Sequence, residues 1–230
     1  MSALDSFTLL RADARTEIRD LTLDSRAAGE GSLFFALHGE QEDGADYAGE
    51  ALARGAVCVV TERSAANTPC VLVPDAHEAA ARLAARWYGE PAKRMRVVGV
   101  TGTNGKTTTT YLLKQLLERC LGARVGLIGT NQNMIGERVL PAERTTPDAL
   151  TLQRLLREMA DEGCTHAVME VSSHALVQRR VGAIEFALGV FTNLTQDHLD
   201  YHGTMEAYCD AKARLFRQCR AAVVNGDDPW

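Results

Sequence analysis

Residues 97–110 read VVGVTGTNGKTTTT, an apolar run that leads into a turn with two glycines, followed by a lysine and four threonines. The valines suit a buried parallel strand, and Gly102 and Gly105 allow the backbone to curl until successive N–H groups face one anion. Lys106 adds a cation, and Thr107 supplies a hydroxyl group of the kind that binds Mg²⁺. We therefore predict a loop that binds phosphate groups.

The residues after this loop are expected to form a helix. Apolar side chains recur there at helical spacing, at Leu112, Leu113, Leu116, Leu117 and Cys120. The positive end of such a helix would face the phosphates. The usual pattern G-x-x-x-x-G-K-[ST] has glycine where this chain has Val100, and the nearest glycines are Gly99 and Gly102. The order of strand, loop, Lys-Thr and amphipathic helix still favours a phosphate loop over a chance glycine-rich turn.

The composition is that of an ordinary globular protein, with 230 residues, 46% of them hydrophobic, and a formal net charge of −5. Such a chain can bury a substantial core and should hold one to two domains. Its lysines and arginines are scattered singly, which argues against a nucleic-acid surface. Apolar runs fall far short of the roughly 20 residues that span a bilayer, and MSALDSFTLL lacks signal-peptide features. We expect a cytosolic protein without membrane insertion.

The six cysteines lie far apart, at positions 58, 70, 120, 164, 209 and 219. They form no CxxC pair, so disulfides and a zinc ribbon are disfavoured. We interpret them as reduced thiols.

Strands and helices are expected to alternate in the first ninety residues. The strand-like runs are 33–37, 57–61 and 71–73, and the helical ones are 47–53 and 76–88. This alternation predicts a small α/β domain. The polar joint at Glu90 and Pro91 sets the expected boundary between domains 1–92 and 93–230.

The same alternation continues in the second domain. Strands are expected at 97–101, 124–129, 166–171, 184–192 and 221–225, with a long loop up to Thr146. A helix should begin at Pro147 with Thr146 as its N-cap and end at Gly163. This pattern predicts a parallel sheet with helices on both faces and ligands at the carboxyl ends of the strands. The loops after Val100, Ile128, Val171 and Phe191 should therefore meet.

Two segments place carboxylates and imidazoles at these strand ends. Glu170 ends an apolar strand, where a Mg²⁺ ligand is expected beside a phosphate loop, although a solvated acid is the alternative. Residues 195–203 read TQDHLDYHG, and His198 and His202 stand at i and i+4. A zinc pair is disfavoured because it requires a continuous helix and a third ligand, and Gly203 interrupts this segment.

Longer stretches carry a resemblance to a known family. The loop TGTNGKTTT at 101–109 resembles the ATP loop of the Mur ligases and of their relative folylpolyglutamate synthetase. The segments LTLDSRAAGEGSLFFALHG at 21–39, MEVSSHALVQRRV at 169–181 and FTNLTQDHLDYHGTMEAYCDAK at 191–212 are similar to the tripeptide-forming branch of the Mur ligases. The resemblance covers essentially the whole chain.

The resemblance implies an ATP-dependent amide ligase of peptidoglycan synthesis, in the bacterial cytoplasm and monomeric when full length. Its substrates would be UDP-N-acetylmuramoyl-L-alanyl-D-glutamate and a diamino acid, meso-diaminopimelate or L-lysine, joined through an acyl phosphate. It also implies a UDP-substrate domain, an incomplete ATP-binding domain ending at VVNGDDPW, and a C-terminal amino-acid domain absent from this chain. The residues that choose the diamino acid would then lie beyond Trp230.

The resemblance also assigns roles to individual residues. Lys106, His198 and Lys212 would be catalytic, and ATP would contact Gly102, Thr103, Asn104, Gly105, Lys106, Thr107 and Thr108. Two Mg²⁺ ions would be bound by Thr107, Glu170, His198 and Lys212, the last carboxylated by CO₂. The UDP-linked substrate would contact Leu23, Ser25, Thr145, Thr146, Ser172, Gln178 and Arg180, with Glu40, Gln41 and Glu42 near the uridine. Without the resemblance, Lys212 is interpreted as a charge on a helix face, paired with Asp210 or Glu206.

Three other functions are compatible with a phosphate loop or with a globular α/β chain. Folylpolyglutamate synthetase shares the loop but lacks a UDP-sugar domain, and residues 1–90 argue against it. A regulatory nucleotide-binding protein of the GTPase type would carry an NKxD sequence, which this chain lacks. A non-catalytic interaction module would leave Glu170, His198 and Lys212 without a purpose.

Overall fold

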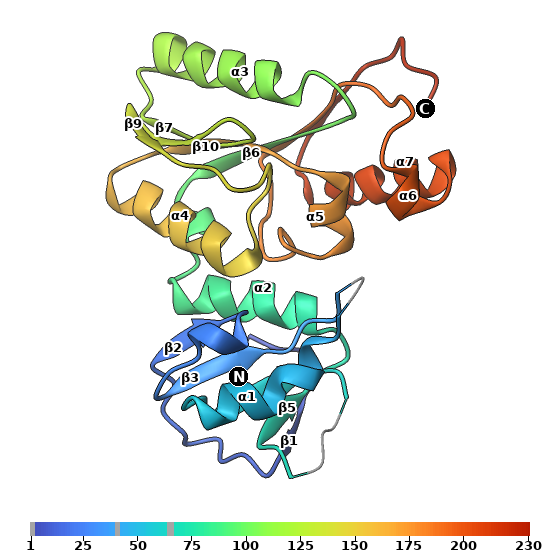
Figure 1. Ribbon diagram of the computed structural model, residues 1–230. Coiled ribbons are helices and arrows are strands. Elements are labelled where there is room, and N and C mark those ends of the chain that lie inside the picture. Colours follow the sequence, from blue (N-terminus) through green and yellow to red (C-terminus); the bar gives the residue numbers. More distant parts are fainter. Residues whose placement is uncertain (1–2, 40–41, 64–66) are drawn as a thin grey trace. The chain divides into compact units, whose positions relative to one another are not determined.

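The computed structural model describes residues 3–39, 42–63 and 67–230 (Figure 1). The chain divides into two compact units, Met1–Arg86 and Trp87–Trp230, here called the first and second units. Each contains a mostly parallel sheet with helices, which confirms the predicted α/β class. Within the described residues, no helix is long and apolar enough to cross a membrane.

The first unit is built on a five-stranded sheet in the order β1-β5-β4-β3-β2. The strands are β1 (Thr8–Leu10), β2 (Asp20–Thr22), β3 (Ser32–Phe35), β4 (Cys58–Thr61) and β5 (Cys70–Leu72). Only β1 is antiparallel to its neighbour. The buried runs SLFF and CVVT were predicted as strands, whereas β1 and β2 were missed because they are short and partly exposed.

The helices of this unit are η1 (Ser25–Ala27), η2 (Gly44–Tyr47), α1 (Ala48–Ala53) and α2 (Ala76–Trp87). Aspartates cap both short 3-10 helices: Asp24 accepts from the backbone N–H of Arg26, and Asp43 accepts from that of Ala45. Six of the twelve residues of α2 are buried alanines, so this helix packs through small side chains.

The second unit has a seven-stranded sheet in the order β12-β11-β6-β10-β7-β8-β9. Its strands are β6 (Arg96–Thr101), β7 (Val125–Ile128), β8 (Asn133–Ile135), β9 (Arg138–Leu140), β10 (His166–Glu170), β11 (Leu188–Phe191) and β12 (Ala222–Val224). The five strands from β12 to β7 are parallel, and β8 and β9 add an antiparallel hairpin at one edge. Their carboxyl ends therefore lie along one edge of the sheet.

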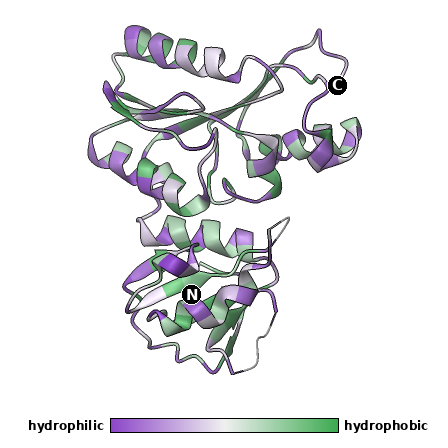
Figure 2. Ribbon diagram, in the orientation of Figure 1, coloured by the Kyte–Doolittle hydropathy of each residue, from purple (hydrophilic) through white to green (hydrophobic). Residues whose placement is uncertain are grey.

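Helices cover both faces of this sheet, as predicted (Figure 1). They are η3 (Pro91–Arg94), α3 (Lys106–Leu121), α4 (Ala149–Asp161), α5 (Ser173–Val177), α6 (Leu199–His202), α7 (Met205–Ala213) and η4 (Arg214–Gln218). Side chains alternate between the faces of β6: Val97 packs in a core with α4, and Val98 and Val100 pack with α3. Hydrophobic colouring follows these strands (Figure 2).

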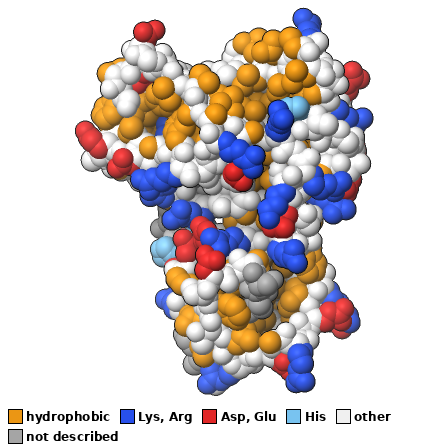
Figure 3. Space-filling view, turned by 180° about the vertical axis from the view of Figure 1, so that it is seen from behind, with side chains coloured by type: hydrophobic (Ala, Val, Ile, Leu, Met, Phe, Trp, Pro, Cys, Tyr) orange, Lys and Arg blue, Asp and Glu red, His pale blue; other side chains and the backbone are white. Residues whose placement is uncertain are grey.

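Some large hydrophobic side chains of the second unit remain exposed. They include Leu112, Leu116 and Leu121 on α3, Val139 on β9, Val223 and Val224 on the edge strand β12, and Trp87 and Trp230. Viewed from behind, groups of hydrophobic side chains are visible on the surface of this unit (Figure 3).

Three predicted elements of the second unit were wrong in detail. Helix α4 begins at Ala149 and its N-cap is Asp148, which accepts from the backbone N–H of Thr151; Thr146 bonds elsewhere. The predicted strand 184–192 shortens to β11, because Phe186 forms only an isolated bridge. The predicted long loop before Thr146 contains the hairpin of β8 and β9, whose strands have only three residues each.

Candidate active site

Both glycines of the loop between β6 and α3 adopt positive φ angles, which glycine takes more easily than other residues. Gly102 has a φ of 139°, and Gly105, at the N-cap of α3, has a φ of 84°. A Cβ atom at Gly102 would lie 1.9 Å from Thr192 Oγ1, so this position requires glycine for both conformation and space. The strand, loop and helix therefore follow in the predicted order.

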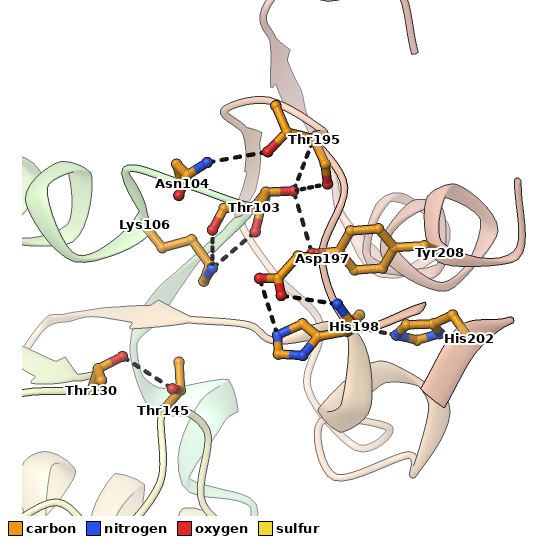
Figure 4. Close-up of polar contacts among 12 residues, drawn as sticks. Thr103, Asn104, Lys106, Thr130, Thr145, Thr195, Asp197, His198, His202 and Tyr208 are labelled. Carbon is orange, nitrogen blue, oxygen red and sulfur yellow. Dashed lines mark hydrogen bonds and ion pairs between the residues drawn. The ribbon is translucent and has the colours of Figure 1, made fainter. Parts of the chain in front are cut away.

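Lys106 is the first residue of α3 and lies over this loop (Figure 4). Its Nζ donates to the carbonyl oxygens of Gly102 at 2.9 Å and Thr103 at 2.8 Å. Burial lowers the pKa of Lys106, and Glu170 and Asp197 oppose this shift. The ammonium group thus adds its charge to the end of α3, where the first N–H groups of a helix have no intrahelical acceptor.

The segment 192–195 after β11 holds the loop in place. The backbone N–H of Thr103 donates to the Asn193 carbonyl at 2.8 Å, and that of Asn104 donates to Asn193 Oδ1 at 3.1 Å. These two N–H groups are therefore used within the protein. Those at the start of α3 are the ones placed to face an anion.

Glu170 ends β10 and is 1% exposed. Its two carboxylate oxygens accept from the backbone N–H of Thr130 at 2.9 Å and from Thr130 Oγ1 at 3.0 Å. The loop after β7 therefore reaches the end of β10, and the loops after β6 and β11 meet at Asn193; these are two of the contacts expected among the four loops. Both groups of contacts lie at the carboxyl edge of the sheet.

Lys212 is 3% exposed, and its Nζ donates to the Gly102 carbonyl at 2.8 Å. The same atom lies 4.3 Å from the centre of the Tyr208 ring. Burial lowers the pKa of Lys212 to about 7, and the nearby charge of Lys106 adds to this shift. The interpretation of Lys212 as a helix-face charge was wrong, because α7 directs this side chain toward the phosphate loop.

His198 stands at the N-cap of α6 with a φ of 51°, and its Nε2 lies 3.4 Å from Asp197 Oδ2. Its ring centre lies 4.8 Å from that of His174. His202 bonds to Ser173 Oγ at 2.9 Å, and its pKa is lowered to about 4, chiefly by burial. Within residues 3–39, 42–63 and 67–230, no group of three His, Cys, Asp or Glu side chains is placed to hold a metal ion.

The predicted contacts for the peptide part of the substrate form a connected network beside Glu170. Thr146 Oγ1 donates to the Glu170 carbonyl at 2.9 Å and accepts from the N–H of Ser172 at 3.0 Å. Arg180 donates to the Thr146 carbonyl at 2.8 Å and to Gln178 Oε1 at 2.6 Å. Burial lowers the pKa of Arg180. Thr145 joins the same edge through Thr130, at 3.0 Å between their hydroxyl oxygens.

The first unit holds the residues predicted near the uridine. Ser25 is buried, and its Oγ donates to Glu50 Oε2 at 2.8 Å, while Leu23 is partly buried two residues earlier. Glu42 is exposed, and the other two residues of that prediction, at positions 40 and 41, lie outside the described residues.

Several residues that shape this edge were not singled out from the sequence. Thr130, Asn193 and Thr195 fix the carboxylate and the loop through their hydrogen bonds, and Tyr208 bonds to Thr103 Oγ1 at 3.3 Å. The run TNLT at 192–195 is polar and follows a strand expected beside the loop. Its position after that strand could have indicated that these residues contact the phosphate loop.

The parallel sheet, the glycine loop that opens a helix, the partly buried Lys106 and the buried Lys212 are typical of the phosphate-loop class of nucleotide-binding proteins. Comparison with known families refines this class. The model of the Mur ligase middle domain matches residues 100–230, and that of the Mur ligase family catalytic domain matches residues 17–88. The chain belongs to the Mur ligase family.

Individual relatives agree with this assignment. The UDP-N-acetylmuramoyl-L-alanyl-D-glutamate--2,6-diaminopimelate ligase of Geobacillus thermodenitrificans is 48% identical, over 100% of this chain and 48% of the relative. A solved structure of a ligase with the same name is 36% identical with a TM-score of 0.79, over 92% of this chain and 44% of that one. The ADP complex of MurF from Thermotoga maritima is 27% identical with a TM-score of 0.58, over 93% and 47% of the two chains. The chain thus spans about half the length of these relatives.

Proposed function

We propose that this chain supplies the ATP-binding and UDP-substrate-binding parts of an amide ligase of peptidoglycan synthesis. The ligase would join a diamino acid to the D-glutamate of UDP-N-acetylmuramoyl-L-alanyl-D-glutamate. The observation that carries the proposal is that Lys106 and Lys212 both donate to the Gly102 carbonyl of one glycine loop, with the Glu170 carboxylate near enough to Lys106 to oppose the lowering of its pKa by burial. The names of the relatives favour 2,6-diaminopimelate over L-lysine as the incoming amino acid.

The proposed reaction begins with transfer of the γ-phosphate of ATP to the side-chain carboxylate of D-glutamate. The amine of the diamino acid then attacks the acyl phosphate, forms the amide bond and releases inorganic phosphate. Lys106 and the start of α3 would hold the phosphates in line and balance their charge. The ADP bound in the related MurF structure supports a nucleotide at this loop.

Three of the proposed ligands, Thr107, Glu170 and a carboxylated Lys212, would offer the oxygen atoms that Mg²⁺ prefers. Thr107, Glu170, His198 and a carboxylated Lys212 would hold up to two ions, which would neutralise charge on the phosphates. Carboxylation requires a neutral amine, and burial lowers the pKa of Lys212 to about 7, so the neutral form is populated near neutral pH. This burial supports CO₂ addition at Lys212.

Each of the two proposed domains, 1–92 and 93–230, would contribute residues that bind the UDP-linked substrate. Leu23 and Ser25 would contact the uridine end, and Thr145, Thr146, Ser172, Gln178 and Arg180 the muramoyl dipeptide. Arg180 supports this role because it is a cation held in place by two hydrogen-bond acceptors. We place this activity in the bacterial cytosol, in a monomeric protein.

The nucleotide site is tested by titrating the 230-residue chain with ATP and with ADP in the presence of Mg²⁺. Lys106→Ala should weaken binding at least 100-fold, because a charge-assisted contact to phosphate is lost at a partly buried site. Lys93→Ala is the matched control, since that lysine is exposed and pairs with Glu90. Similar affinities for all three proteins would refute the assignment.

The substrate assignment is tested by a chimera. Residues 1–230 replace the matching half of the Geobacillus relative, and the product is given ATP, Mg²⁺ and the UDP-linked dipeptide with either diamino acid. Tripeptide should form with 2,6-diaminopimelate. A folded chimera that binds ATP but does not bind the UDP-linked dipeptide would contradict the substrate assignment and leave the nucleotide site standing.

A further inference from the structure

We propose that Asn193 is a positioning residue that holds the phosphate loop in the form that receives the nucleotide. This role rests on the proposed nucleotide site and adds to it a residue outside the loop. The structure places Asn193 against the loop with three polar atoms, two from its side-chain amide and one from its backbone.

The side-chain amide of Asn193 grips a single residue of the loop. Its Oδ1 accepts from the backbone N–H of Asn104 at 3.1 Å, and its Nδ2 donates to the carbonyl of the same residue at 3.1 Å. The reversed amide would set donor against donor and acceptor against acceptor, so the network admits one orientation. The Asn193 carbonyl also accepts from the N–H of Thr103 at 2.8 Å.

The strand register explains why Asn193 is in reach. In the parallel pair of β11 and β6, Phe191 lies opposite Thr101. Two residues further along each chain, Asn193 comes beside Thr103. A polar residue at this position is therefore delivered to the loop by the sheet itself.

The loop needs such support because of its glycines. Gly102 and Gly105 supply the two positive φ angles that shape it, and glycine allows many other conformations when nothing restrains the chain. The two hydrogen bonds from the Asn193 side chain to Asn104, here called the clamp, act between these two glycines. Because the clamp already orders the loop in the free chain, less conformational entropy is lost when a nucleotide binds.

The clamp makes a specific prediction for hydrogen exchange without nucleotide. In Asn193→Ala, the amide proton of Asn104 loses its acceptor and should exchange at least tenfold faster. The amide proton of Thr103 should stay protected, since its acceptor is a backbone carbonyl. Asn225→Ala is the matched control, because the Asn225 side chain donates to the Thr192 carbonyl at 2.9 Å and accepts from the N–H of Asp227, both outside the loop. Equal exchange at Asn104 in all three proteins would overturn the proposal.

Nucleotide titration gives the second readout. Asn193→Ala should lower the affinity for ADP about tenfold or more, because the nucleotide must then order a loop that is no longer restrained. The two lost hydrogen bonds should also lower the unfolding midpoint of the free chain. Asn225→Ala should bind like the unaltered chain. Normal affinity in Asn193→Ala together with a large loss in Lys106→Ala would refute the clamp alone. Equal affinities in all variants would refute the nucleotide site itself.

A conservative variant covers the case in which Asn193→Ala does not fold. Asn193→Asp keeps an acceptor for the Asn104 N–H but turns a carboxylate oxygen toward the Asn104 carbonyl. Protection at Asn104 should persist while ADP affinity falls. Unchanged affinity would count against the proposal.

Discussion

The two units differ in how their predicted site residues are assembled. In the second unit, the predicted residues gather at one edge of the sheet: Lys106 and Lys212 bond to the loop, and a second set of hydrogen bonds joins Glu170 to Thr130 and Thr146. In the first unit, Ser25 was predicted to contact the substrate, but its hydroxyl group donates a hydrogen bond to Glu50. Part of the segment predicted near the uridine lies outside the described residues. A site at the carboxyl edge of a parallel sheet can therefore be deduced from the strand order. Strand order gives no such guide to the residues predicted near the uridine.

The largest expected effect comes from a substitution in the loop between β6 and α3, which is part of the predicted site of the second unit. Gly102→Ala places a Cβ atom 1.9 Å from Thr192 Oγ1 at a φ of 139°. We expect a loss of about 2–4 kcal/mol in the free energy of unfolding and a large loss of nucleotide affinity. Gly49→Ala is the control, because its Cβ would meet nothing within 4 Å. Equal urea midpoints for the two variants would show that the loop is not constrained as described.

Lys212 tests the electrostatics of the same edge. Burial lowers its pKa from 10.5 to about 7 in the folded chain. Between these two values the unfolded chain binds a proton that the folded chain does not, so stability should rise with pH across this window. Below pH 7 the cost of burying the charge is present in full.

Lys212→Met should remove this dependence. We expect the variant to be more stable than the unaltered chain by about 1 kcal/mol or more near pH 6, with a flatter profile up to pH 10. Urea unfolding in CO₂-depleted buffer measures it, with exposed Lys93→Met as the control. If the free energy of unfolding varied with pH in the same way for the unaltered chain and for Lys212→Met, the lowered pKa of a buried Lys212 would be contradicted.

Ser25 tests the other half of the comparison. Ser25→Ala removes a hydrogen bond of 2.8 Å to Glu50, which keeps Arg54 as a partner at 3.1 Å. The expected cost is about 1 kcal/mol in the stability of the first unit. If Ser25 also contacts the UDP-linked substrate, affinity for that substrate falls more than Glu50→Ala lowers it. Equal losses in the two variants would assign Ser25 to structure alone.

Much of the second unit could be predicted because its signals are local. Apolar runs mark the central strands, and glycines with Lys-Thr mark the loop. The N-cap of α4 was misplaced because Thr146 and Asp148 are both good caps, and only the tertiary bond from Thr146 to the Glu170 carbonyl decides between them. The hairpin of β8 and β9 was missed because strands of three residues carry too little pattern.

The site shows a similar limit. The position of Lys212 against the Gly102 carbonyl joins residues 110 positions apart, and no periodicity reports such a contact. The resemblance named this lysine, but its burial came from the structure. Asn193 could have been found from its place after a strand beside the loop strand, because parallel register delivers it there.

The smallest expected effect concerns Thr101, the last residue of β6. Its hydroxyl oxygen is buried and has no hydrogen-bond partner among the described residues. Thr101→Val keeps the shape and removes this group, so stability should stay within about 1 kcal/mol or rise, because no bond is lost. Nucleotide affinity should not change, since Gly102 and Lys106 keep their contacts. A clear loss of affinity with unchanged stability would mean that the hydroxyl group serves the bound nucleotide, and the phosphate site would then extend one residue into the strand.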